Sequence, residues 1–220
     1  MSNVPSLKDT LLIVAVIALA WAVFMLVNQP PKGNWVTADG VKIWPLPKEA
    51  VLVERNAAFE KRVRELYESG RLIVFTGQAI SGGIDKVRAR EKAKINAYKE
   101  LAEYFETRLQ TFAQLVEGQI QAIKDKDRVT SVAVNAYKRV TELFSEAKVS
   151  GAYVYAVWEE MVGSLVYTTV LLVFDPVGAV EAAKQTVMAD QEISKAIEEL
   201  GKNGVDFFKM LNEVISEAKK

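Results

Sequence analysis

The sequence contains no cysteine and no histidine among its 220 residues. Without cysteine the chain forms no disulfide and offers no thiolate to a metal ion. Without histidine it has no imidazole ligand, no histidine general base, and neither the Ser-His-Asp nor the Cys-His arrangement of nucleophilic enzymes. These two absences exclude several classes of metal site and hydrolase before any motif is considered.

An excess of charge is missing as well, because 28 Lys and Arg residues balance 28 Asp and Glu residues. A nucleic-acid-binding protein needs a clear basic excess, so we predict no nucleic-acid partner. Half of the residues are apolar, which is too many for a disordered chain. The composition therefore predicts a folded protein with one modest core.

One long apolar run begins at Leu11 and ends at Val27. With its flanking residues the run reaches about 28 Å as a helix, close to the ~30 Å hydrocarbon core of a bilayer. We therefore predict a transmembrane signal-anchor over residues 1–28, with a cleaved signal peptide as the alternative. Few residues precede the run, so the rest of this single-pass protein would lie outside the cytoplasm, in the periplasm or at the cell surface.

Proline and glycine interrupt the next segment, which predicts a linker over residues 29–54. Its Trp35 and Trp44 are either interfacial anchors at the lipid headgroups or side chains that pack into the folded part. Residues 55–220 are then predicted to form one extracytoplasmic domain, a length that suits a single core.

Hydrophobic periodicity predicts an α+β fold for this domain. The expected order is a helix over 55–68, a strand over 72–80, a very long helix from residue 84, a helix over 132–144, strands over 148–159 and 164–175, and helices over 177–200 and 205–218. Residues 160–163 are the expected hairpin turn. The centre of the domain thus reads as strand, long helix, strand, strand, with extra C-terminal helices.

Two patterns mark the long helix. A row of small residues at a spacing of four, Ala89, Ala93 and Ala97, is typical of a helix that lies close against a sheet. A heptad stripe follows it, made of Ile95, Ala102, Leu109, Val116 and Ile123, with Tyr98, Phe105 and Phe112 at the offset positions. The stripe packs either on this chain's own sheet and second helix or against a second copy in a coiled coil.

The two late strands are apolar on both faces, so both faces of their hairpin need a cover. The long helix can cover one face, and we expect the C-terminal helices or another subunit on the other. A possible self-association or ligand surface therefore includes residues of this hairpin and of the heptad stripe: Tyr153, Tyr155, Trp158, Tyr167, Leu171, Phe105 and Phe112. The aromatic rings among them could stack on a planar ligand.

No pattern indicates catalysis. The glycine-rich segment from Gly77 to Gly83 lacks the Lys-Ser/Thr pair of a phosphate-binding loop. Glu159 and Glu160 are adjacent on a strand and face opposite ways, which suits a solvated turn. The basic residues at the start of the long helix alternate along the sequence and do not form one stripe. We therefore predict no catalytic, metal or cofactor-binding residues and no enzyme activity.

Residues 72–175 resemble the small envelope lipoprotein family typified by a twenty-kilodalton membrane-associated lipoprotein antigen. The resemblance is carried by Phe75-Thr76-Gly77-Gln78-Ala79, by Ala89-Arg90, Ala93, Ala97 and Leu101, by Val149-Ser150-Gly151-Ala152 and by Val170-Leu171-Leu172-Val173. It implies a dodecin-like fold, in which a small antiparallel sheet wraps a long helix, and a place in the bacterial envelope. A membrane helix stands here in place of the lipidated cysteine, which favours the inner membrane or a single-membrane cell. No functional residue carries over.

The sequence as a whole predicts a non-enzymatic, membrane-anchored envelope protein that self-assembles, as a homo-oligomer, or scaffolds other envelope proteins. The alternative is an extracytoplasmic binding module for a planar or apolar small ligand.

Overall fold

The computed structural model describes residues 34–81, 85–121, 126–145 and 151–217. Trp35–Lys220 forms a compact unit, and both hydrophobic clusters of the described residues lie within residues 36–215. That unit therefore has its own hydrophobic core, which is the property that defines a domain. None of the described helices is both long enough and apolar enough to cross a membrane. The expected membrane segment lies outside the described residues.

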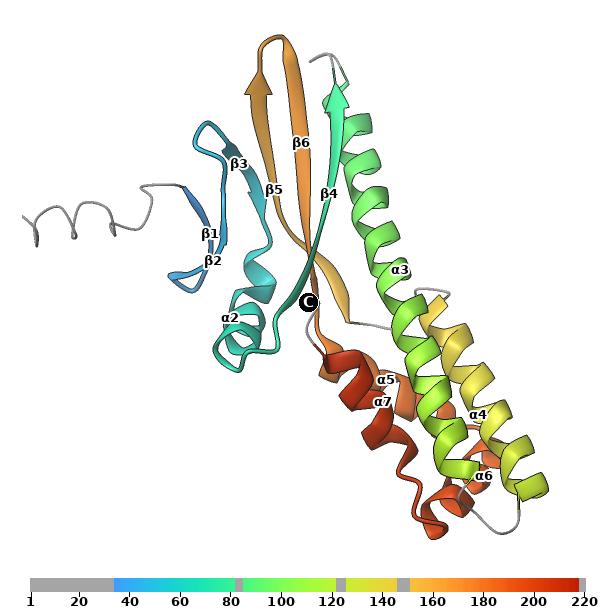
Figure 1. The fold of residues 1–220 in the computed structure, drawn as a ribbon. Coiled ribbons are helices and arrows are strands. Elements are labelled where there is room, and N and C mark those ends of the chain that lie inside the picture. The colour runs from blue at the N-terminus through green and yellow to red at the C-terminus, as the bar shows by residue number, and fades with distance from the viewer. Residues whose placement is uncertain (1–33, 82–84, 122–125, 146–150, 218–220) are drawn as a thin grey trace, which may run out of the picture. The chain divides into compact units, whose positions relative to one another are not determined.

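The α+β class is confirmed, and its centre is a four-stranded antiparallel sheet with the order β3-β5-β6-β4 (Figure 1). The strands are β3 (Val51–Arg55), β4 (Ile73–Ser81), β5 (Ala152–Val162) and β6 (Leu165–Phe174). The hairpin turn is shorter than expected, because β5 continues through the predicted turn and Val162 pairs with Leu165. Gly163 has a φ of 63° and supplies the left-handed residue that the tight turn requires.

Helix α3 (Lys86–Gln121) lies against one face of this sheet, over β4 and β6. The close approach expected from the alanine row is confirmed at Gly77 of β4. A Cβ atom at Gly77 would lie 2.0 Å from the carbonyl oxygen of Ala93 and 2.2 Å from the amide nitrogen of Ala97. Only a glycine opposite alanines allows the two backbones to come this near.

The heptad expectation fails in the first half of α3. Ile95 is 65% exposed and Ala102 is exposed, whereas Leu109 and Val116 are buried. The buried face instead runs through Ala89, Ala93, Ala97, Leu101, Phe105, Leu109, Phe112 and Val116. These spacings of three and four residues follow the 3.6-residue period of a straight helix on a globular core, not a coiled-coil seam.

The second half of α3 packs in a helical layer with α4 (Lys126–Ser145), α5 (Pro176–Met188), α6 (Gln191–Lys202) and α7 (Phe207–Ser216). A single helix was expected over 177–200, and this prediction is wrong. The carboxylate of Asp190 accepts hydrogen bonds from the amides of Glu192 and Ile193, and so it caps a new helix, α6. Asp175 caps α5 in the same way through the amide of Gly178.

The second face of the sheet is covered by the segment before β4, which corrects two expectations. The two-stranded sheet of β1 (Trp35–Ala38) and β2 (Val41–Pro45) and the helix α2 (Glu60–Glu68) pack on this face in one cluster with the hairpin. Neither the C-terminal helices nor another subunit is needed there. Residues 35–54 also form three strands of the folded unit and are not a linker, and Trp44 packs against the cluster.

We predict that Gly77→Ala lowers the free energy of unfolding of residues 35–220 by about 3 kcal/mol, because the new methyl group must push α3 away from β4. Gly118→Ala is the matched control. Gly118 is exposed on α3 and has open space around it, so the substitution should stabilise the protein by about 0.5–1 kcal/mol. Urea denaturation measures both. Equal effects of the two substitutions would contradict the close packing at Gly77.

Candidate functional site

The aromatic residues of the hairpin are mostly covered by the chain itself. Tyr155, Trp158 and Leu171 are buried in the cluster beneath β1, β2 and α2. The hydroxyl of Tyr155 donates a hydrogen bond to the carbonyl oxygen of Thr37 at 2.7 Å, and burial raises the pKa of this phenol to about 12. It is therefore a neutral donor that attaches the β1–β2 hairpin to the main sheet.

One ring face of Tyr153 is covered by the chain itself. Its ring stacks on Phe59 with a centroid separation of 3.9 Å and an interplanar angle of 18°. Burial also raises the pKa of Tyr153. The stacking site that the sequence suggested for a ligand is thus occupied by another residue of the same chain.

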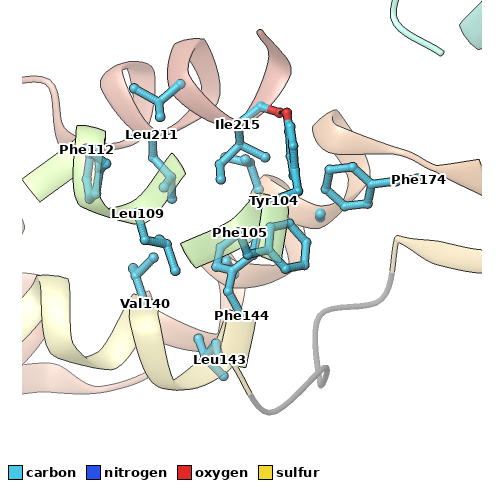
Figure 2. Packing of buried hydrophobic residues seen from close by; sticks show 14 of the residues in the cluster. Tyr104, Phe105, Leu109, Phe112, Val140, Leu143, Phe144, Phe174, Leu211 and Ile215 are labelled. Carbon is cyan, nitrogen blue, oxygen red and sulfur yellow. Dashed lines mark hydrogen bonds between the residues drawn. The ribbon is translucent and has the colours of Figure 1, made fainter. Parts of the chain in front are cut away.

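The two phenylalanines of the stripe lie in the other cluster, within the helical layer (Figure 2). Phe105 makes edge-to-face contacts with Phe144 and Phe174 at centroid distances of 4.9 and 5.1 Å. Phe112 contacts Phe207 in the same way at 5.0 Å. These contacts place most of the expected self-association surface inside the monomer, and of its seven residues only the half-buried Tyr153 and Tyr167 remain near a surface.

Exposed apolar side chains gather where the sheet ends. Met161, Val162 and Leu165 flank the β5–β6 turn and are 66%, 52% and 41% exposed. Ile80, 55% exposed, belongs to the end of β4 that pairs with β6 beside this turn (Figure 1). We call these four residues the hairpin tip. The apolar residues within the expected turn were the sequence feature that could have revealed this surface, since turns usually carry polar residues.

A groove lies on the face that carries α3. The helix packs on β4 and β6, and the floor beside it is formed by residues of β5 and β6: Val154, Val157, Thr168 and Val170. Val51 and Val53 of the edge strand β3 form one rim, and Val87 of α3 lies on the other. The volume of the groove is about 720 Å³. This is within the range of about 300–1,000 Å³ that is typical of small-molecule sites.

Three basic residues at a spacing of four, Lys86, Arg90 and Lys94, form the helical wall of the groove. Lys86 pairs with Glu159 of β5 at 2.7 Å, and Arg90 pairs with Glu54 of β3. This wall was not predicted from the sequence, because the five basic residues from Lys86 to Lys94 taken together do not form one stripe. Residues four apart share a helix face, whereas Arg88 and Lys92 are not among the residues that line the groove.

The polar atom of the floor is the hydroxyl of Thr168, which is buried and has no hydrogen-bond partner among the described residues. Such a group destabilises a folded protein by about 1–3 kcal/mol. Its neighbour Thr169 differs, because the hydroxyl of Thr169 accepts a hydrogen bond from the side-chain amide of Gln78 at 3.3 Å.

No family model matches this chain, and comparisons with curated proteins and with solved structures give no match.

We predict that Thr168→Val raises the free energy of unfolding of residues 35–220 by about 1 kcal/mol, because it replaces an unpaired buried hydroxyl by a methyl group of the same size. Thr169→Val should lower it by a similar amount, since that change removes a hydrogen bond. Thermal and urea denaturation test the pair, and destabilisation by Thr168→Val would show that its hydroxyl has a partner.

Proposed function

We propose that the protein is a non-enzymatic, membrane-anchored envelope protein that self-assembles or scaffolds other envelope components, and that copies associate through the hairpin tip. The observation that carries the proposal is the exposure of the tip itself. Contiguous exposed apolar side chains on a soluble unit mark an interaction surface. Here they occur where two long strands end and no described element covers them.

A second copy of the chain is the occupant that the charges favour. The net charge of the chain is zero, so copies do not repel each other at long range. The turn itself, Gly163-Ser164, carries no charge, and the nearby Glu159 is already paired with Lys86. Association of two such tips would bury aliphatic surface around a turn that carries no charge.

Attachment to the membrane and the family relationship extend the proposal beyond the described residues. The apolar run from Leu11 to Val27 supports an N-terminal transmembrane helix. The order β4, α3, β5, β6 supports a relation to the strand, long helix, strand, strand core of the dodecin-like envelope lipoprotein family, with α4 inserted before β5 and α5 to α7 as further additions. The proposed place of the folded unit is the extracytoplasmic side of a cell membrane.

Light scattering of residues 35–220 over a dilution series tests the proposal. We expect an oligomer at high protein concentration that dissociates on dilution, because an interface made of so few side chains is small. The triple variant Met161→Thr, Val162→Thr and Leu165→Thr should be a monomer with unchanged melting temperature, because threonine keeps the strand propensity and removes apolar surface.

The control variant is Leu115→Gln with Val134→Gln, which removes exposed apolar side chains from α3 and α4. It should leave the oligomer intact. A wild-type unit that is monomeric at every concentration, or an oligomer that survives the triple substitution, would contradict assembly through the tip.

A further inference from the structure

We infer that the groove beside α3 binds a long-chain carboxylate, with the acyl chain on the valine floor and the carboxylate at Lys94. This site is separate from the hairpin tip and does not depend on assembly. The inference rests on three features of the groove: its apolar interior, its volume, and Lys94, the basic residue of its wall for which the described residues provide no carboxylate partner.

The interior suits a slender apolar body. Val154, Val157 and Val170 line the floor, and the exposed Val51, Val53 and Val87 surround the opening. A volume of about 720 Å³ accommodates a single chain. The planar ligand suggested by the sequence is less suitable, because no aromatic ring lines this groove.

The charges of the wall select an anion. Lys86 and Arg90 are each neutralised by a carboxylate of the sheet, Glu159 and Glu54. Lys94 has no carboxylate partner among the described residues, although its side chain lines the same groove. An ammonium group beside apolar surface binds a carboxylate through a charge-assisted hydrogen bond.

Glu91 also lines the groove and is the remaining acidic group there. At 100° per residue it lies about 160° around the helix from Ala93, which faces the sheet, whereas Lys94 lies about 100° away. Lys94 is therefore closer to the floor than Glu91 is, and the charge that an occupant meets beside the valines is positive.

Isothermal titration calorimetry of residues 35–220 tests the inference with three probes of one chain length: dodecanoate and dodecylammonium, each below its micelle concentration, and dodecanol below its solubility limit. We expect saturable binding of dodecanoate at one site per chain, with weaker binding of the alcohol and weakest binding of the ammonium. Lys94→Gln should weaken dodecanoate binding about tenfold, which is equivalent to about 1.4 kcal/mol.

Lys92→Gln is the matched control, because Lys92 is exposed on the same helix and does not line the groove. It should leave the affinity unchanged. Val87→Glu should also weaken dodecanoate binding, and it should leave the protein folded, since an acidic residue in the first turn of a helix is favourable. Light scattering should show that none of these variants changes the oligomer.

The inference is overturned if dodecanoate shows no saturable binding, if dodecylammonium binds as tightly, or if Lys92→Gln weakens binding as much as Lys94→Gln does. The inference would also be overturned if the protein bound anionic vesicles through Lys94 but did not bind monomeric dodecanoate. That result would assign the surface to membrane binding. Assembly through the hairpin tip would stand in each case.

Discussion

The contact between Gly77 and the backbone of α3 at Ala93 and Ala97 is the constraint on which the arrangement of the sheet face depends. Because β4 carries no side chain at this point, the helix axis lies close above β4 and β6 rather than over the middle of the four strands. A helix held so near one edge of a sheet cannot cover the strands at the opposite edge of the same face. The valines of β5 and β3 are consequently left beside the helix as the floor and rim of the groove.

The length of α3 accounts for the second half of the structure. Its 36 residues extend about 54 Å, whereas the nine residues of β4 extend only about 30 Å. The helix therefore continues beyond the sheet, and the apolar residues of that continuation need a different partner. The helices α4, α5, α6 and α7 provide it, and Phe112 of α3 contacts Phe207 of α7 there.

Sequence patterns predicted the elements that bury a regular apolar face, and they failed where structure depends on distant parts of the chain. The alanine row and the C-terminal helices were predicted because each has a local period, and the two late strands because they are continuous apolar runs. The β1–β2 hairpin was read as part of a linker because proline and glycine interrupt residues 28–47, yet Val36, Ala38 and Ile43 are buried in one cluster with residues of β5 and β6. The groove could not be predicted, since its basic wall becomes visible only when Lys86, Arg90 and Lys94 are placed opposite Glu159 and Glu54.

The way in which the sheet is covered also limits how copies of the protein can meet. On one face of the sheet, β1, β2 and α2 bury Tyr155, Trp158 and Leu171. In the other cluster, the helical layer buries Phe105 and Phe112. Neither face of the sheet is therefore open along its whole length. What remains is the end of the sheet, where β5 and β6 continue past the elements that cover them. An interface at that end would be small and aliphatic, and small interfaces are weak when both partners diffuse freely. Attachment to one membrane would raise the effective concentration of the tips and make such an interface sufficient.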